Sequence, residues 1–514
     1  MIVVALVAAF LSFGMPAIAV DDLSRPIRVS PDGHFLVQPD GEPFFWLADT
    51  AWKLFYRLSR EEADEYLNDR AAKGFTVIQA VATGELYGDG LRRPNRYGQM
   101  PFIDTDPTRP NIPYWEHVDW IIEDAARHGL RVALLPVWGF SFVSGPPSER
   151  VFDESNAEFY GRWIGARYRG KGVIWVLGGD VNPLWPDALN LKIFQTNDAQ
   201  AQDGRPSPIK DFRPVYDAMA KGIEAGNGGY AFITYHITSL SFSGTAHPRT
   251  SLYFHDRAWL DMNMLQSSHF IDQSPHLRRL GADFGWNSTY NYEPIGDEYR
   301  SLPVRPVVDG EPHYEDHPID FDPNASKIAY WRAYDVRNAA YHALFAGAAG
   351  HTYGSFNIWD FYQPDRGEQA APGRLIRQPW QQALQAPGAG QMQYAKNLLL
   401  SRPYFSRIPD QTLIVGDPGE GQQHIGATRD KDGSYAMLYL PQGQSVAVDL
   451  SKMTGSRVIG WWFDPRTGIA KKIGDAFPAS GQRSFTAPTQ GKNQDWILVL
   501  DDEGKGFAVP GTAR

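Results

Sequence analysis

The sequence predicts an α/β protein: a (β/α)8 TIM barrel followed by a small C-terminal antiparallel β-sandwich. Strand-like apolar runs alternate with helical patterns eight times over roughly 350 residues, as expected for such a barrel. Beyond Pro409 the helical patterns give way to short strand-like runs separated by Gly, Pro and Asp. A doubly wound open sheet is the alternative, but no strand is followed by Gly-x-Gly-x-x-Gly or by a phosphate-binding loop.

The composition limits the possible partners. A chain of 514 residues can hold one large domain and one or two small ones. Its formal net charge of -10 argues against nucleic acid, because phosphates require a basic surface. The chain has no cysteine, which excludes disulfides, thiolate chemistry and zinc sites built on Cys. We find no cofactor-binding motif and expect no cofactor.

Residues 1–19 have the pattern of a secretory signal peptide. An apolar core from Ile2 to Phe13 precedes the small-x-small site Ala17-Ile18-Ala19, although no Lys or Arg comes before Arg25. A membrane-anchoring helix is the alternative, but the stretch is short for a full span and Pro16 interrupts it. We therefore expect export to the bacterial periplasm or exterior, with no membrane contact after cleavage.

The barrel is expected at residues 20–405, after a short β segment at 27–45 with turns at 31–33 and 39–41. Short apolar runs bounded by turn residues predict the strands. They are expected at 44–49, 76–83, 131–138, 173–180, 231–236, 264–269, 305–311 and 351–355.

Helical patterns separate these strands. Ser59 and Glu62 form the Ser-x-x-Glu capping pattern of a helix that ends near Gly74. Further helices are expected at 114–128, 155–169, 212–225, after 274, at 325–346 and at 391–400. The loop at 84–111 is long for a compact domain, and such loops are usually functional.

Residues 406–514 are expected to form the β-sandwich. Its strand-like runs lie at 412–415, 435–440, 445–450, 458–463 and 496–500. A sandwich next to a barrel can bind carbohydrate or can brace the barrel, and we favour bracing.

Two of the predicted strands end in a carboxylate. The fourth ends in Gly178-Gly179-Asp180, and the seventh ends in Glu311. Parallel barrel strands bring such residues to one mouth, where two carboxylates can cleave a glycosidic bond. One protonates the leaving oxygen, and the other attacks the sugar or activates water. The structural alternative is that Asp180 caps a helix and Glu311 closes a loop salt bridge.

The segments 45–52, 73–75, 178–180 and 309–312 together resemble the apiosidase-like glycoside hydrolases of family 140. The C-terminal region resembles the collagen-binding-type module that follows the barrel in those proteins. The resemblance covers nearly the whole mature chain. It implies an acid/base on strand four, here Asp180, and a nucleophile on strand seven, here Glu311. It also implies apiose-containing pectin side chains as a substrate, whereas we do not carry over the collagen label.

Further candidates for substrate binding lie at predicted strand ends or carry aromatic rings, on which sugars commonly stack. Asp49 could bind sugar hydroxyls or be a buried structural acid, and Glu85 could be a third acid or a solvated loop residue. A strand-end His is more often a hydrogen-bonding group than a lone metal ligand. The candidates are Asp49, Trp52, Glu85, Trp138, Asn182, His236, His269, His313, Tyr353 and Trp359.

His313, Glu315 and His317 alternate along a proline-bracketed segment, which would place them on one face of a strand. The spacing lacks the His-Glu-x-x-His register of a metalloprotease, so we expect no metal. The favoured interpretation is an exported glycoside hydrolase that acts on polysaccharide side chains with retention, through two carboxylates. The alternatives are a noncatalytic carbohydrate-binding barrel and a metallopeptidase.

Overall fold

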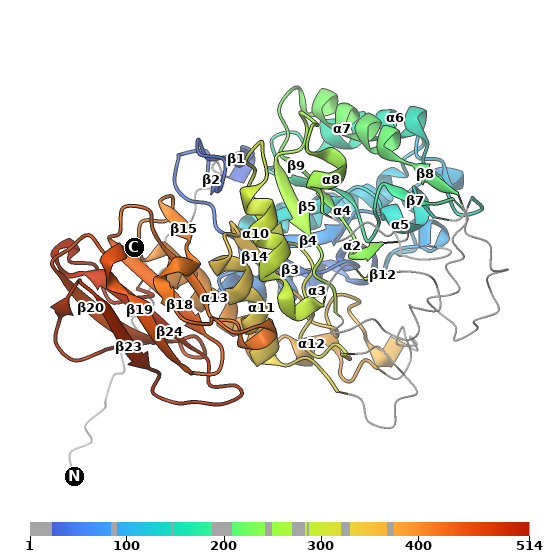
Figure 1. Ribbon diagram of the computed structural model, residues 1–514. Helices are drawn as coiled ribbons and strands as arrows, with labels where there is room; N and C mark the ends of the chain where they lie inside the picture. Colours follow the sequence, from blue (N-terminus) through green and yellow to red (C-terminus); the bar gives the residue numbers. More distant parts are fainter. Residues whose placement is uncertain are drawn as a thin grey trace, which may run out of the picture.

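The computed structural model describes residues 23–83, 90–145, 147–187, 208–241, 249–269, 283–284, 287–319, 329–366 and 375–512. It consists of a barrel with its surrounding helices and a C-terminal β domain packed beside it (Figure 1). The predicted signal peptide and Glu85 lie outside the described residues. No helix in the described ranges is long and apolar enough to cross a membrane.

Eight parallel strands close into the predicted barrel, and their order around it follows the chain. The last strand pairs with the first, Tyr353 opposite Asp49. Every one of these strands is buried along its length, because the barrel interior covers one face and helices the other; this explains their nearly continuous apolar runs. The strands are β3 (Trp46–Thr50), β4 (Val77–Val81), β5 (Arg131–Leu135), β6 (Ile174–Gly178), β9 (Ile233–His236), β11 (Met262–Leu265), β13 (Val307–Asp309) and β14 (Gly350–Tyr353).

Two of the helices around the barrel begin at a Ser or Asp that caps them. Ser59 and Glu62 form the expected capping box of α3 (Arg60–Ala72), and Asp153 with Asn156 forms another at α6 (Glu154–Arg167). The other long helices are α4 (Ile112–Arg127), α7 (Arg213–Asn227), α10 (Tyr292–Arg300), α11 (Ala333–Phe345) and α13 (Pro387–Leu400). Single-turn helices are α2 (Leu54–Arg57), α5 (Gly139–Phe142), α8 (Ser251–Phe254) and α12 (Trp380–Ala383).

Several boundaries differ from the prediction. The sixth barrel strand was expected at 264–269 but spans Met262–Leu265, because the polar residues that follow leave the strand to line the barrel mouth. Helix α11 begins at Ala333 rather than at 325. Helix α13 begins four residues earlier than expected, with Pro387 at its first position, where a missing N–H costs nothing. The described part of the predicted loop, residues 90–111, contains two short 3-10 turns at Gly90–Arg92 and Ile103–Thr105, and α4 follows it directly.

Outside the barrel, short strands form small pairs. They are β1 (Arg28–Val29) with β2 (Leu36–Val37), β7 (Leu184–Pro186) with β8 (Ile209–Asp211), and β10 (Leu240–Ser241) with β12 (Asp283–Phe284).

The C-terminal domain is the predicted antiparallel sandwich of two sheets. The larger sheet contains β15 (Arg407–Pro409), β17 (Gly426–Asp430), β18 (Tyr435–Leu440), β20 (Arg457–Asp464), β21 (Ile469–Lys472), β22 (Phe477–Pro478) and β24 (Trp496–Asp502). The smaller contains β16 (Ile414–Val415), β19 (Ser445–Asp449) and β23 (Gln482–Thr486).

The larger sheet is covered on both faces, which explains the uninterrupted apolar sequence of β18. Tyr435, Met437 and Tyr439 pack into the barrel's core, whereas Ala436 and Leu438, with the opposite orientation, pack toward the smaller sheet. The Tyr439 ring stacks on Tyr341 of α11 with 5.0 Å between centroids. In Figure 1 the β domain accordingly lies against α11 and α13.

Buried ion pairs fix this contact. Arg337 of α11 binds Asp495 through two hydrogen bonds of 3.0 and 2.7 Å. Arg402, just after α13, binds Asp501 of β24 through two of 2.8 and 2.7 Å. Bidentate pairs of this kind define an orientation as well as a contact, so the sandwich is held in one position against the barrel.

Candidate active site

Asp180 and Glu311 each lie two residues beyond the end of a barrel strand, β6 and β13 respectively. These are the fourth and seventh strands of the barrel. The chain reaches Asp180 through a left-handed turn, with φ of 81° at Gly178, 107° at Gly179 and 53° at Asp180. A Cβ at Gly179 would lie 2.7 Å from the Trp138 ring, so the close approach as well as the φ requires glycine there.

One side chain, Gln266, connects the two carboxyl groups. Its amide nitrogen lies 2.9 Å from Asp180 Oδ1 and 2.9 Å from Glu311 Oε2. Twice that distance, 5.8 Å, is therefore the upper limit for the separation of these two oxygens. Because the two hydrogens of an amide point about 120° apart, linear bonds to both oxygens correspond to a separation of about 5 Å.

Glu311 is 5% exposed and is surrounded by hydrogen-bond donors. His236 Nε2 lies 3.0 Å from Oε2, His269 Nε2 lies 3.2 Å from Oε1, and the Tyr314 hydroxyl donates to Oε1. Burial raises the pKa of Glu311, but the hydrogen bonds from His236 and His269 outweigh it and hold the pKa well below its usual range. Glu311 is thus held as a carboxylate.

Asp180 has the opposite tendency. Burial, followed by the nearby charge of Glu311, raises the pKa of Asp180 to about 6, although the hydrogen bond from Gln266 opposes this. The backbone N–H of Asp180 donates to His236 Nδ1 over 3.2 Å. Since Nδ1 accepts, the ring proton of a neutral His236 is on Nε2, where it faces Glu311. One histidine therefore links the two acids in a defined tautomer.

Aromatic side chains wall the cluster. Trp52 donates through Nε1 to the Tyr314 hydroxyl at 3.1 Å, and its ring meets Trp138 edge-on with 5.2 Å between centroids. The His236 ring packs edge-on against Trp52 at 5.4 Å. The structure thus brings together six of the residues singled out in the sequence. They are Asp180, Glu311, Trp52, Trp138, His236 and His269.

Other candidates lie elsewhere. Asp49 is fully buried and accepts hydrogen bonds of 2.6 Å from Tyr66 and from Arg70 of α3, so it faces the helix layer. His313 binds the Asp335 carbonyl at 3.0 Å and stacks on Trp331.

Three further candidates for substrate binding have contacts or positions of their own. The Tyr353 hydroxyl donates to Glu315 at 2.7 Å. The Trp359 ring carries the Lys53 ammonium 5.0 Å from its centroid. Asn182 is buried two residues after Asp180.

Two residues of the cluster, Gln266 and Tyr314, were not singled out from the sequence. Gln266 directly follows β11, in a strand whose end was predicted too late to mark it as a mouth residue. Tyr314 is three residues beyond Glu311, where the chain has already left the strand. A rule that inspects every polar residue just past a barrel strand would have found Gln266 but not Tyr314.

The three residues considered as metal ligands each bind a different protein group. His313, Glu315 and His317 go to different partners: the Asp335 carbonyl, the Tyr353 hydroxyl and the Pro318 carbonyl. Among the described residues, Asp64, Asp124 and His128 could approach a common ion. That group lies on the outer helices, and the Arg127 guanidinium 2.6 Å from Asp124 disfavours a cation there.

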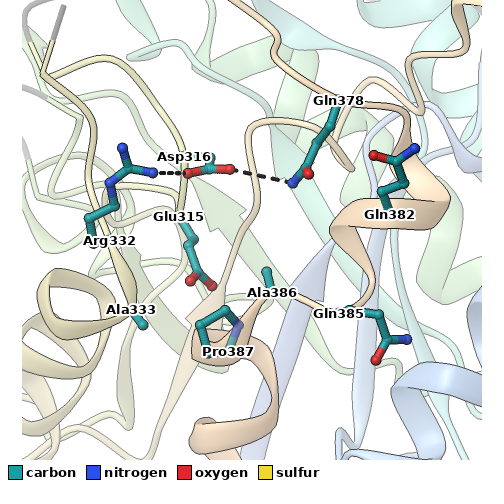
Figure 2. A pocket seen from close by; sticks show the side chains of 9 residues that line it. All are labelled: Glu315, Asp316, Arg332, Ala333, Gln378, Gln382, Gln385, Ala386 and Pro387. Carbon is teal, nitrogen blue, oxygen red and sulfur yellow. Dashed lines mark hydrogen bonds and ion pairs between the residues drawn. The ribbon is translucent and has the colours of Figure 1, made fainter.

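A cavity of about 380 Å³ lies on the other side of the segment after Glu311. Tyr314 turns toward Glu311, whereas Glu315 turns away, accepting from Tyr353 and from the Gly388 N–H at the start of α13. Figure 2 shows Asp316 between Arg332, 2.7 Å away, and Gln378, 3.4 Å away. The other residues that line the cavity are Ala333, Gln382, Gln385, Ala386 and Pro387.

Comparisons with known proteins agree with the fold. Residues 30–406 match the family described as "Apiosidase-like, catalytic domain", and residues 408–501 match "Putative collagen-binding domain of a collagenase". No curated protein matches the chain.

Solved structures extend the comparison. A "Glycoside hydrolase" is 31% identical with a TM-score of 0.77, over 94% of this chain and 98% of that one. A glycoside hydrolase family 5 structure from Bacteroides vulgatus is 30% identical with a TM-score of 0.77, over 95% and 96%. A structure from that organism described as a "putative glycoside hydrolase" shares the fold at 13% identity and a TM-score of 0.59, over 95% and 84%. The chain belongs to the apiosidase-like family of glycoside hydrolases.

Proposed function

We propose that this glycosidase works with retention of anomeric configuration, with Asp180 as acid/base and Glu311 as nucleophile. The observation that carries the proposal is the Gln266 amide bound to both carboxyl groups, which corresponds to a separation of about 5 Å. Retaining enzymes place their carboxyl groups about 5–5.5 Å apart, whereas inverting enzymes leave about 6.5–9.5 Å for a water molecule.

The reaction follows in two balanced steps. Protonated Asp180 gives its proton to the glycosidic oxygen as Glu311 attacks the anomeric carbon, so the leaving alcohol departs and a glycosyl ester forms on Glu311. Asp180, now a carboxylate, takes a proton from water, whose oxygen attacks the same carbon. The sugar is released, and Glu311 and protonated Asp180 are regenerated. The opposed pKa shifts of the two acids support this division of roles.

For substrate, we propose terminal sugars on polysaccharide side chains, with apiose-containing pectin as the first class to test. The family match supports this choice. Residues 1–19, with an apolar core and a small-x-small site, support export to the periplasm or the exterior as the location.

The test compares Asp180→Asn and Glu311→Gln with the wild type on a panel of plant and microbial glycans. We expect both variants to fold with unchanged melting temperature and to lose at least about 10³-fold in kcat, because neither acid can be replaced by a neutral amide. Asp49→Asn is the control for activity, because it places an amide in a barrel strand away from the cluster, although the loss of charge beside buried Arg70 should lower its melting temperature.

Two product measurements address the individual roles. Azide should restore turnover to Glu311→Ala and yield a glycosyl azide of inverted configuration, because azide replaces the missing nucleophile. NMR of the first product formed by the wild type should show the substrate's own anomer. Near-wild-type turnover in either amide variant, or an inverted first product, would refute the proposal.

A further inference from the structure

The Gln266 amide links the end of its own barrel strand to the ends of three others at the mouth. It is 5% exposed and directly follows β11. Its nitrogen donates to Asp180, beyond β6, and to Glu311, beyond β13, while its oxygen accepts the Ser239 N–H, beyond β9, at 2.8 Å. All three bonds are within the normal range for amides. The side chain is therefore fixed at both ends of its amide group.

The orientation of this amide is determined by its partners. A backbone N–H can only donate, so the group facing Ser239 must be the amide oxygen. The amide nitrogen then faces both carboxyl groups and offers one hydrogen to each. No exchange of oxygen and nitrogen satisfies the same three partners.

The two-step reaction moves one negative charge between these acids. Before the first step Glu311 is the carboxylate and Asp180 holds the proton; afterwards Glu311 is an ester and Asp180 is the carboxylate. We propose that Gln266 is a positioning residue that stays bound to this single negative charge throughout the cycle, through one hydrogen in the free enzyme and through the other in the glycosyl-enzyme. The proposal rests on the retaining reaction proposed above.

An amide suits this task better than other groups. It does not titrate, so its donors persist at any working pH, and it needs no movement as the charge passes from one side to the other. A charged donor would bind both carboxylates and hold Asp180 unprotonated, preventing it from acting as an acid.

The titratable side chains around the pair contact the carboxyl group of Glu311, and His236 in addition lies close enough to lower the pKa of Asp180. His269 and Tyr314 contact Glu311, and His236 contacts Glu311 by Nε2 while accepting from the Asp180 backbone. Among these contacts Gln266 is the one side chain that donates to both carboxyl groups. Removing the Gln266 amide should therefore raise the pKa of Asp180 and the pKa of Glu311 together.

The test is Gln266→Met, which keeps length and removes both donors. We expect kcat/KM at the optimum to fall roughly 10- to 100-fold, and both limbs of the pH profile to move upward by about one pH unit. The control is Gln79→Met on β4, equally buried, whose amide donates to the Gly310 carbonyl at 3.1 Å. That variant should leave both limbs in place.

A second measurement does not require activity. At pH 7 both carboxyl groups are ionised, whereas at pH 4 Asp180 is protonated and Glu311 alone is charged. Gln266→Met should therefore lower the melting temperature more at pH 7 than at pH 4, whereas Gln79→Met should lower it equally at both. If Gln266→Met does not fold, Gln266→Asn, which is too short to reach both acids, replaces it. Unmoved limbs with a pH-independent melting difference would overturn the proposal. A wild type that cleaves no glycan would instead refute the catalytic roles, while the melting data would still test the placement of Gln266.

Discussion

At the scale of residues, Asp180 and Glu311 are distinguished by their neighbours. Both are carboxyl groups in the same mouth, yet donors gather on Glu311 and burial dominates at Asp180. The difference is produced by side chains from β9 and the segments after β11 and β13, and of these only Tyr314 lies near either acid in the sequence. A site of this kind is a property of the assembled mouth.

The pH dependence of activity follows from these shifts. Activity requires Glu311 ionised and Asp180 protonated, and the pKa of Asp180 is raised to about 6. We therefore expect a bell-shaped profile of kcat/KM whose basic limb lies near pH 6 and whose acid limb lies below the usual glutamate range. Activity would thus fall as pH rises through 6. A profile that increases from pH 6 to 8 would contradict the assignment of Asp180 as the acid.

Metal removal should have no effect on catalysis. The two-carboxylate reaction requires no Lewis acid, and His313, Glu315 and His317 have separate protein partners. We expect prolonged treatment with a chelator to leave glycan cleavage unchanged, and the protein to hydrolyse no gelatin. Loss of activity on chelation, restored by a stoichiometric transition metal, would contradict this mechanism.

The sequence located some site residues better than others. Asp180 and Glu311 were visible because each ends an apolar run whose direction a parallel barrel determines. Asp49 ends a similar run, but its side chain points to the outer face of the strand, where Arg70 binds it. Side chains alternate between the two faces of a strand, and the sequence does not show which face is the outer one until the neighbouring helix is placed. The bridging role of Gln266 depends on distances across three strands, which a single sequence does not contain.

At the scale of elements, α6 and α7 pack unusually closely. Gly161 and Gly165 of α6 face Gly222 and Gly226 of α7, each pair spaced by four so that both glycines share one helix face. A Cβ at Gly165 would lie 2.4 Å from the Ile223 carbonyl oxygen, and one at Gly222 would lie 2.3 Å from the Glu158 carbonyl oxygen. The helix backbones themselves are therefore in contact.

Substitution in this contact should destabilise the protein. We expect Gly165→Ala to lower the free energy of unfolding by roughly 1–3 kcal/mol, since the obstacle is backbone that no rotamer change relieves. The control is Gly390→Ala in α13, where nothing lies within 4 Å of the added Cβ. That change should be neutral or stabilise by up to about 1 kcal/mol, because alanine favours helix. Melting curves of the two variants measure both effects, and equal shifts would contradict the close contact.

The strands of the barrel were predicted well because each is a buried apolar run. The start of α3 was predicted because its capping box is visible in the sequence. In the sandwich, β18 was predicted residue for residue, whereas β23 was not identified. The reason is visible in the burial of β23, where Phe485 is the one buried residue of five, so its sequence carries no apolar alternation.

At the scale of the whole molecule, the ion pairs between barrel and sandwich should matter more than those on the surface. Arg402→Met leaves Asp501 buried without its partner, and we expect a loss of about 3–5 kcal/mol in the free energy of unfolding. Arg457→Met removes a similar pair with Glu503, but both side chains are about half exposed, so we expect less than about 1 kcal/mol. Chemical unfolding of the two variants gives the comparison. Equal losses would mean that the Arg402 pair does not hold the domains together.

The two-domain architecture was predictable because the hydrophobic period changes near residue 409. The contact by which the barrel and the sandwich cover each other was not predictable, because the apolar residues of α11 fit the pattern of an ordinary barrel helix. In the structure twelve of its thirteen residues are buried, because the barrel covers one side and β18 with its neighbours the other.

This double burial has a consequence for biosynthesis. The ribosome completes α11 and α13 before it has made the strands that cover them, and residues 406–514 take roughly 5–20 s to translate at typical rates of synthesis. During that interval the apolar outer side of α11 has no intramolecular cover. A gene truncated at this point would leave that side permanently uncovered, so the shortened product should accumulate as aggregate rather than as a free-standing enzyme.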